Sequence, residues 1–259
     1  MELPIYKLDA FSSTLFGGNP AAVVLLTEWL PDATLQSIAA ENNLSETAFV
    51  VRGRGDFEIR WFTPTVEVDL CGHATLATGS VLLSHEAEVD RVRFRTRKSG
   101  ELTVSRHGDL LALDFPERRA RPVPAEVGLE AALRVTPVEV HAARDLMVVV
   151  ADEDVVRGLD PDPAAVAGLD AFAVTVTAPG RHSDFVSRFF APRAGIPEDP
   201  VTGSAHCTLV PYWSARLGKT KLHALQLSAR GGELFCEHRG ERVIIAGRVV
   251  EYLRGTISV

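Results

Sequence analysis

The chain has 259 residues, of which 46% are hydrophobic and 24% are charged, and its formal net charge is −7. This composition is typical of a soluble globular protein, with one large domain or two domains of about 130 residues. An excess of 34 acidic over 27 basic residues argues against a nucleic-acid-binding protein. No apolar run approaches the roughly 18 residues that are needed to span a membrane.

The start of the chain and its cysteines bear on where the protein works. Residues 1–4 contain no basic side chain and lead into no long apolar stretch, so we expect no signal peptide. The cysteines, Cys71, Cys207 and Cys236, are few and odd in number, which favours a reduced protein over a disulfide-linked one. We therefore expect a cytoplasmic protein.

The elements predicted in the first half are one amphipathic helix, several strands and one apolar helix. The amphipathic helix is predicted to begin with Asp32 as its N-cap and to run to about Glu41. Residues 73–84 contain no Asp, Glu, Lys or Arg, and a helix without a charged face has to be buried on all sides. We therefore expect a curled sheet around this helix. Its strands are predicted at residues 57–62, 92–96, 102–105 and 110–115.

A stretch rich in proline and arginine, residues 116–124, cannot form a regular helix or a central strand. It predicts a boundary between two domains, 1–116 and 117–259, although the last strand could return to the N-terminal half. The second half repeats the first, with an uncharged helix at 204–215 that Pro211 should kink or delay. Its strands are predicted at residues 184–190, 225–228, 233–237 and 243–250.

The two halves also share sequence. Residues 56–64, DFEIRWFTP, and 184–192, DFVSRFFAP, are identical at five of nine positions, at an offset of 128. Gly72 and Gly203 precede the two uncharged stretches at an offset of 131. Three such pairings in the same order, the third being Gly-Glu-Leu at offset 132, indicate an internal duplication. We expect an α+β fold of two pseudo-symmetric domains with a cleft between them.

The start of each buried helix is a candidate binding site. Unpaired N–H groups and the helix dipole favour an anion there, and Gly72 and Gly203 would let a carboxylate approach the backbone. The alternative is that both glycines only serve turns. Nearby acids, Asp199 among them, could reflect the usual charge bias of helix starts, and His73 could be an ordinary core histidine.

Two further side chains are candidates for catalysis. Glu46 leads into an apolar strand, and the repeat places it opposite residues 171–173, which contain no acid. A carboxylate in only one half suits an asymmetric proton-transfer site, but it could equally be a strand-edge acid. Cys71 precedes a helix start, where the pKa of a thiol falls, although a buried inert cysteine is an equal alternative. The sequence has no spacing typical of a zinc site, so we expect no metal.

At these residues the chain resembles the phenazine-biosynthesis PhzF-like family. The segments that carry the resemblance include GNPAAVV at 18–24, NLSET at 43–47, DLCGHAT at 69–75 and EDPVTGSA at 198–205. The resemblance implies the diaminopimelate-epimerase-like fold, a homodimer and an isomerase without a cofactor. The best-known member isomerises trans-2,3-dihydro-3-hydroxyanthranilate.

The resemblance also implies the roles of individual residues. Glu46 would be the general acid/base that moves a proton between carbon atoms of a small conjugated acid. His73 and Asp199 would hydrogen-bond polar groups of the substrate, next to Gly72. The N–H groups of Gly203 and Ser204 would bind the substrate carboxylate.

Two other functions stay open at this point. A racemase or epimerase of the diaminopimelate-epimerase type uses one thiol from each half, and Cys71 lies at the matching place in the first half. The second half has Thr202 there, and a hydroxyl is too weak an acid to replace a thiol. The other alternative is a protein that binds small acids or partners without turnover.

Overall fold

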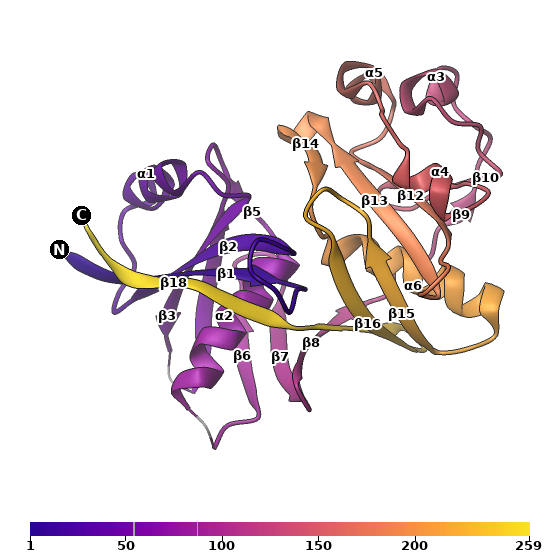
Figure 1. Cartoon of the computed structure of the whole chain (residues 1–259). Helices are drawn as coiled ribbons and strands as arrows, with labels where there is room; N and C mark the ends of the chain where they lie inside the picture. The colour runs from indigo at the N-terminus through magenta and orange to yellow at the C-terminus, as the bar shows by residue number, and fades with distance from the viewer. Residues whose placement is uncertain (54, 87) are drawn as a thin grey trace. The chain divides into compact units, whose positions relative to one another are not determined.

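The computed structural model describes residues 1–53, 55–86 and 88–259. The chain divides into two compact units (Figure 1): unit 1 comprises residues 1–114 and 246–259, and unit 2 comprises residues 115–245. The last strand is thus part of unit 1, and the chain leaves that unit two residues before the predicted boundary at 116.

Unit 1 is a mixed sheet with two helices. Strands β2 and β3 are parallel, as are β4 and β6, and the other neighbouring strands are antiparallel. The helices are α1 (Asp32–Asn42) and α2 (Gly72–His85). The strands are β1 (Glu2–Ala10), β2 (Asn19–Leu26), β3 (Glu46–Arg52), β4 (Phe57–Phe62), β5 (Glu67–Val68), β6 (Arg91–Arg95), β7 (Glu101–His107), β8 (Leu110–Pro116) and β18 (Val249–Ser258).

Unit 2 contains the remaining strands, again with parallel and antiparallel pairings, and more short helices. Its longest helix is α6 (Gly203–Leu217); the others are α3 (Leu129–Leu133), α4 (Glu153–Arg157), α5 (Pro163–Gly168) and the 3₁₀ turn η1 (Pro192–Ala194). Its strands are β9 (Arg121–Pro122), β10 (Glu139–Ala142), β11 (Leu146–Val149), β12 (Val174–Pro179), β13 (Phe185–Ala191), β14 (Ile196–Asp199), β15 (Lys221–Gln226), β16 (Gly232–Arg239) and β17 (Arg242–Gly247).

The strand pairings of the two units repeat. In unit 1 the successive pairings of β1, β2, β3, β4, β6 and β7 are antiparallel, parallel, antiparallel, parallel and antiparallel. Strands β10, β11, β12, β13, β15 and β16 follow the same order in unit 2. Helices α2 and α6 occupy equivalent places in this order, since each follows the short strand β5 or β14. The duplication in the sequence is therefore also a duplication of topology.

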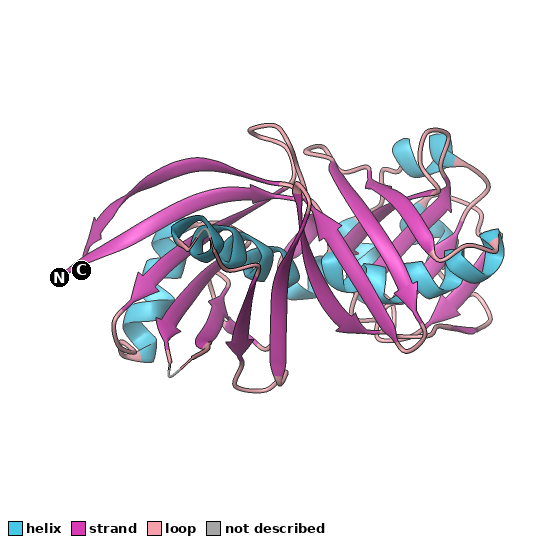
Figure 2. Ribbon diagram, turned by 90° about the horizontal axis from the view of Figure 1, so that it is seen from below, coloured by secondary structure: helices cyan, strands magenta, loops and turns pink. Residues whose placement is uncertain are grey.

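Helix α2 is the centre of unit 1. It contacts β1, β2, β3, β6, β7 and β18, so that the strands surround it (Figure 2). All but three of its 14 residues are buried, as expected for a helix without a charged face. A Cβ at Gly79 would lie 2.5 Å from Val104 Cγ1 of β7, so the close packing of helix on strand requires a glycine there. A second core lies between the sheet and α1, where Leu35 and Ile38 pack with Phe49 and Phe62.

Helix α6 is the buried helix of unit 2. It begins at Gly203 without delay and runs through Pro211 to Leu217, so the expected delay of its start is wrong. Proline lacks the N–H that would bond to the carbonyl of residue i−4, here Cys207. That carbonyl instead accepts a hydrogen bond from the backbone N–H of Arg118, at 2.9 Å. The proline-rich stretch after unit 1 thus satisfies the group that Pro211 leaves unpaired.

Two other predictions need correction. The N-cap of α1 is Pro31 and not Asp32, because the Asp32 carboxylate binds the Arg60 guanidinium at 2.9 Å instead of capping the helix. The single strand predicted at 243–250 is two strands that separate at Arg248, β17 and β18.

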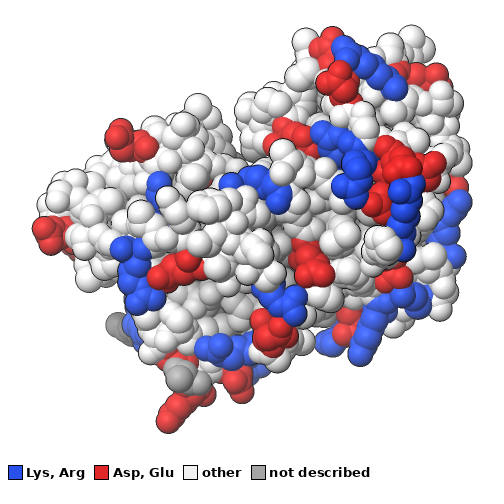
Figure 3. All heavy atoms as spheres, viewed as in Figure 1, with Lys and Arg blue, Asp and Glu red and all other residues white. Residues whose placement is uncertain are grey.

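Two observations concern the exterior. Acidic and basic side chains are interspersed on the face shown in Figure 3, without a continuous basic surface among the described residues of that face. None of the helices in the described part of the chain combines the length and apolar character that crossing a membrane requires.

Candidate functional site

Glu46 is the first residue of β3, where the strand joins the sheet between β2 and β4. It pairs with Ala21 of β2 in the parallel register, and the next residue, Thr47, pairs with Phe62 of β4. In unit 2 the equivalent register joins Val174 and Phe190, so the residue that corresponds to Glu46 is Ala173. The carboxylate is therefore present in unit 1 alone of the two repeats.

Cys71 and His73 lie at the N-terminal end of α2. Cys71 is the N-cap residue, with an extended backbone (φ −138°, ψ 113°) and without a capping side-chain hydrogen bond. His73 is in the first turn, and both residues are 5% exposed. Because β3 contacts α2, the start of the strand and the start of the helix bring Glu46 to these two side chains.

The three side chains form a compact buried cluster. His73 Nε2 lies 3.2 Å from Glu46 Oε2, and Cys71 Sγ lies 3.6 Å from Nδ1 and 3.9 Å from Nε2 of the same ring. A nitrogen of His73, the sulfur of Cys71 and a carboxylate oxygen of Glu46 all lie within 4.8 Å of one another. The contact between His73 and Glu46 is an ion pair, and the buried Oε2 has no other polar partner among the described residues.

The cluster changes the ionisation of its members. Burial alone would lower the pKa of His73, but the adjacent Cys71 and Glu46 side chains outweigh burial and raise that pKa well above its usual value. Burial, together with the negative charge of Glu46, raises the pKa of the Cys71 thiol to about 11. Cys71 is therefore a protonated thiol at neutral pH, and the expectation of a lowered pKa at the helix start is wrong.

The start of α6 in unit 2 has a different polar network. Asp199, the last residue of β14, accepts a hydrogen bond from the Thr202 hydroxyl at 2.5 Å. Gln226, at the end of β15, accepts from the Thr202 backbone N–H and donates to the Asp199 carbonyl, both at 2.8 Å. This buried amide fixes the turn that precedes Gly203. Nothing local in the sequence indicates that the Gln226 side chain reaches the helix start.

Other side chains of unit 2 have more ordinary places. His206 is fully buried, and its Nδ1 lies 2.9 Å from the Thr202 carbonyl. Burial lowers its pKa to about 4, so it is a neutral core histidine. Arg144, in the turn between β10 and β11, donates to the Ser204 hydroxyl at 3.3 Å. Sequence reasoning did not find Arg144, because it lies 60 residues away from its partner.

Glu67, which precedes α2, and Glu198, which precedes α6, are equivalent residues of the two repeats, and both have a structural role. Glu67 accepts two hydrogen bonds from Arg60, both at 2.7 Å. In unit 2, Glu198 accepts two from Arg188, at 2.6 and 2.8 Å. Both acids thus tie their segment to the neighbouring strand.

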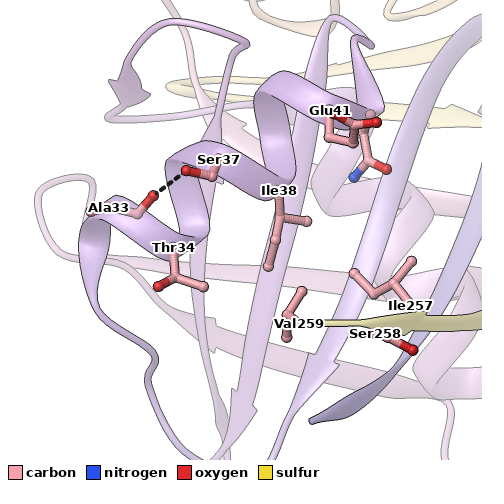
Figure 4. A pocket seen from close by; sticks show the side chains of 9 residues that line it. Ala33, Thr34, Ser37, Ile38, Glu41, Ile257, Ser258 and Val259 are labelled. Carbon is pink, nitrogen blue, oxygen red and sulfur yellow. Dashed lines mark hydrogen bonds between the residues drawn. The ribbon is translucent and has the colours of Figure 1, made fainter.

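A groove of unit 1 lies away from the Glu46 cluster (Figure 4). It runs between α1 and the end of β18, and Thr34, Ile38 and Ile257 are among the side chains along it. None of the three clustered residues lines this groove, and it holds no group of convergent titratable side chains. We therefore place the candidate site at Glu46, Cys71 and His73.

Comparison with known proteins identifies the family. The family described as phenazine biosynthesis-like protein, PhzC-PhzF, matches residues 8–255. The chain belongs to the PhzF family. Among its PhzF relatives, two proteins of Pseudomonas aeruginosa, both named uncharacterized isomerase, are 55% and 53% identical to it over the full length of each chain. The human phenazine biosynthesis-like domain-containing protein is 38% identical, also over the full length of both.

Solved structures support the same assignment. The crystal structure of a PhzF-family protein of Enterococcus faecalis superposes with a TM-score of 0.96 at 46% identity and covers 100% of both chains. A hydroxyproline epimerase of Agrobacterium vitis superposes with a TM-score of 0.61 at 12% identity, over 99% of this chain and 92% of that one. The PhzF chain thus has the α+β, diaminopimelate-epimerase-like fold, in agreement with the prediction.

Proposed function

We propose that this PhzF-family protein is an isomerase that works without a cofactor and moves a proton between carbon atoms of a small, conjugated, carboxylate-bearing substrate. Glu46 is the general acid/base of this reaction. The names of the relatives support an isomerase in general terms. The substrate class and the role of Glu46 are our proposal.

The single observation that carries the proposal is the state of Glu46 Oε2. A buried polar atom normally has a hydrogen-bond partner, and this oxygen has none among the described residues. A carboxylate oxygen with no hydrogen-bond donor other than His73 near it can accept a proton from a substrate carbon and return it to another carbon. The Glu46 side chain is 12% exposed, which limits competition from water.

His73 supports this chemistry electrostatically. The Glu46 carboxylate, 3.2 Å from the ring, raises the pKa of His73 and so favours the positively charged form of the imidazole. The ring can donate to an oxygen on which negative charge develops. We assign His73 to this role.

The residues of unit 2 keep the roles that the family resemblance implies. Asp199 would hydrogen-bond a polar group of the substrate, and the N–H groups of Gly203 and Ser204 would bind its carboxylate. These roles, and the homodimer, stay predictions.

The ionisation of Cys71 and the contacts of Thr202 argue against a racemase that uses two thiols. A thiol with a pKa of about 11 is a poor base at neutral pH. The equivalent residue in the other repeat, Thr202, uses its hydroxyl to bond to Asp199. We therefore expect that neither proton transfer involves Cys71.

The proposal is tested by incubating the protein with trans-2,3-dihydro-3-hydroxyanthranilate in D₂O and following deuterium incorporation by NMR. We expect wild type to convert this compound and Glu46→Gln to lose activity by about 10²–10⁴-fold, because the amide cannot accept the proton. Glu41→Gln, a change of an exposed acid on α1, is the matched control and should retain full activity.

Two outcomes would contradict the proposal. The first is that the Glu46→Gln variant has the activity of wild type. This result would show that Glu46 is not the general base. The second is a wild-type protein that exchanges deuterium into neither this compound nor any of a panel of cyclic and conjugated small acids. Loss of activity in Cys71→Ser with an active Glu46→Gln would point to thiol chemistry instead.

A further inference from the structure

The three tryptophans of the chain differ in what their indole nitrogens bind. Trp29 donates to the Glu58 carboxylate at 2.8 Å, and Trp213 donates to the Thr177 hydroxyl at 3.0 Å. Trp61 is 1% exposed, and its Nε1 is buried without a hydrogen-bond partner among the described residues. A buried indole N–H usually finds a partner, because leaving it unpaired costs free energy. Trp61 thus holds a donor for an acceptor that the described part of the chain does not supply.

The strand register places Trp61 on the same face of the sheet as Glu46. Trp61 of β4 pairs with Ala48 of β3, and Glu46 comes two residues before Ala48. Since side chains alternate along a strand, Glu46 and Trp61 are diagonal neighbours on one face. Such neighbours lie about 7–8 Å apart, within reach of long and aromatic side chains. The opposite face packs on α1 through Phe49 and Phe62. The indole N–H and the carboxylate therefore share the side of the sheet that faces away from α1.

The second repeat lacks both groups. Phe189 pairs with Thr175 as Trp61 pairs with Ala48, so Phe189 is the residue that corresponds to Trp61. Phe189 is also buried, at 4% exposure, which shows that this place in the fold can be filled by an aromatic ring without a donor. The residue that corresponds to Glu46 is an alanine as well. The carboxylate and the unpaired N–H thus occur together in unit 1, and the repeated fold requires neither.

We propose that Trp61 is a substrate-binding residue whose Nε1–H donates a hydrogen bond to a carboxylate or carbonyl oxygen of the small acid on which Glu46 acts. Trp61 then selects for compounds that carry such an oxygen close to the carbon that exchanges its proton. An oxygen that gains negative charge as the carbon loses its proton binds the N–H more tightly. The identity of the ligand as an isomerase substrate rests on the proposed function, whereas the binding of an acid by Trp61 does not.

The test follows the three indole N–H signals of the full-length protein by NMR, after labelling the tryptophans with ¹⁵N. The Trp61 signal is assigned by its loss in Trp61→Phe. The first probe is 3-hydroxyanthranilate, an aromatic counterpart of the assay compound that has no sp³ ring carbon to lose a proton, and the panel of small acids follows. We expect the Trp61 signal to move downfield, as an N–H signal does when a hydrogen bond forms. The signals of Trp29 and Trp213 should stay, because both N–H groups are already bonded.

Two matched variants measure what the hydrogen bond contributes to binding. Trp61→Phe, which keeps a ring but removes the donor, should bind the acid that moves the Trp61 signal about ten-fold more weakly, as measured by calorimetry. Trp29→Phe removes an indole that is already bonded to Glu58, and should bind the acid as wild type does. Circular dichroism checks that both variants are folded. If Trp61→Phe does not fold, Trp29→Phe and Trp213→Phe assign the Trp61 signal by elimination, and the titration of wild type decides.

The outcomes separate this proposal from the isomerase. A shift of the Trp61 signal without turnover of any acid would support binding by Trp61 and contradict the proposed function. Turnover of an acid that leaves the Trp61 signal unmoved at saturation would overturn the role of Trp61 and leave the isomerase intact. A panel that gives neither shift nor turnover would overturn both. A long-lived water molecule bonded to the N–H, detected by its magnetisation transfer to the Trp61 signal with and without the acid, would also overturn the role of Trp61.

Discussion

Two buried histidines show how a neighbouring side chain decides the charge of an imidazole. His73 lies beside Glu46 and Cys71, and these neighbours raise its pKa despite full burial. His206 is equally buried, but its Nδ1 contacts the Thr202 carbonyl and no carboxylate, and burial lowers its pKa to about 4. Its other nitrogen, Nε2, has no hydrogen-bond partner among the described residues. A carboxylate within reach therefore separates a charged site residue from a neutral core residue.

The state of His206 predicts sensitivity to acid. Its pKa is lower in the folded than in the unfolded protein, so the stability it contributes is complete above about pH 6.5 and is lost as the pH falls toward 4. A shift of this size corresponds to about 3 kcal/mol of unfolding free energy between pH 7 and pH 4. We expect His206→Gln to reduce the loss of stability with acid, as measured by urea unfolding at several pH values between 4.5 and 7.

The exposed His182 of the same unit supplies the control for this experiment. His182→Gln should leave the pH dependence of unfolding as it is in wild type. Equal pH dependence in His206→Gln and wild type would show that His206 is not held neutral.

At this scale the sequence predicted some features and missed others. Glu46 could be predicted as a site residue because the corresponding residues of the second repeat contain no acid. His73 could be predicted because it follows a glycine at a helix start. The protonation of Cys71 could not be predicted, because it depends on burial and on a carboxylate 25 residues away. The same holds for Gln226, whose partners Thr202 and Asp199 lie 24 and 27 residues away in the sequence.

The element that positions the candidate site is α2. It begins with Cys71 as N-cap, presents His73 in its first turn, and is held at the centre of unit 1 by strands on several sides. Its approach to β7 depends on Gly79, whose missing side chain makes room for Val104. The packing of one glycine thus fixes the depth at which the helix lies in the sheet.

This contact predicts that Gly79→Ala destabilises the protein. Alanine favours a helix over glycine by about 1 kcal/mol, but its Cβ would lie 2.5 Å from Val104 Cγ1. We expect overpacking to prevail and to lower the unfolding free energy by about 1–3 kcal/mol, measured by urea unfolding. Gly168→Ala, at the end of α5, is the control, because a Cβ there meets nothing within 4 Å and should be neutral or stabilising. Equal stability of the two variants would contradict the prediction.

The positions of the helices and strands could largely be predicted, whereas the details of their ends could not. The uncharged stretches of the sequence correctly predicted both central helices. Runs of β-branched and aromatic residues correctly predicted strands such as β4. Local rules failed where a distant group competes. Asp32 is a good capping residue in isolation, but Arg60 is a stronger partner for its carboxylate. Pro211 should destabilise a helix because it leaves the Cys207 carbonyl without a helical partner. The backbone N–H of Arg118 binds this carbonyl and so reduces the destabilisation.

For the molecule as a whole, the duplication preserves an ion pair as well as a topology. Arg60 with Glu67 in unit 1 and Arg188 with Glu198 in unit 2 are both two-bond pairs between equivalent segments. The surroundings differ in one respect. The Arg60 guanidinium has a second carboxylate, Asp32, whereas the guanidinium of Arg188 donates instead to backbone carbonyls of residues 156 and 159.

This difference predicts unequal effects of the same substitution in the two repeats. Glu198→Gln leaves a guanidinium that is 12% exposed without a charged partner, and should cost about 3 kcal/mol of unfolding free energy. Glu67→Gln should cost less, about 1–2 kcal/mol, because Asp32 remains 2.9 Å from Arg60. Urea unfolding at low ionic strength measures both effects, with exposed Glu130→Gln as a neutral control. A larger loss for Glu67→Gln than for Glu198→Gln would contradict this account.

The place of β18 has a consequence for the order in which the protein can fold during synthesis. This strand pairs along the length of β1, from Glu2 with Ser258 to Ala10 with Val249. The ribosome therefore makes the first strand of unit 1 at the beginning and its partner only after all of unit 2. At 5–20 residues per second, the 135 residues from 114 to 249 take roughly 7–27 s. During that interval β1 has a free edge, whereas unit 2 has its entire sequence before β18 is made.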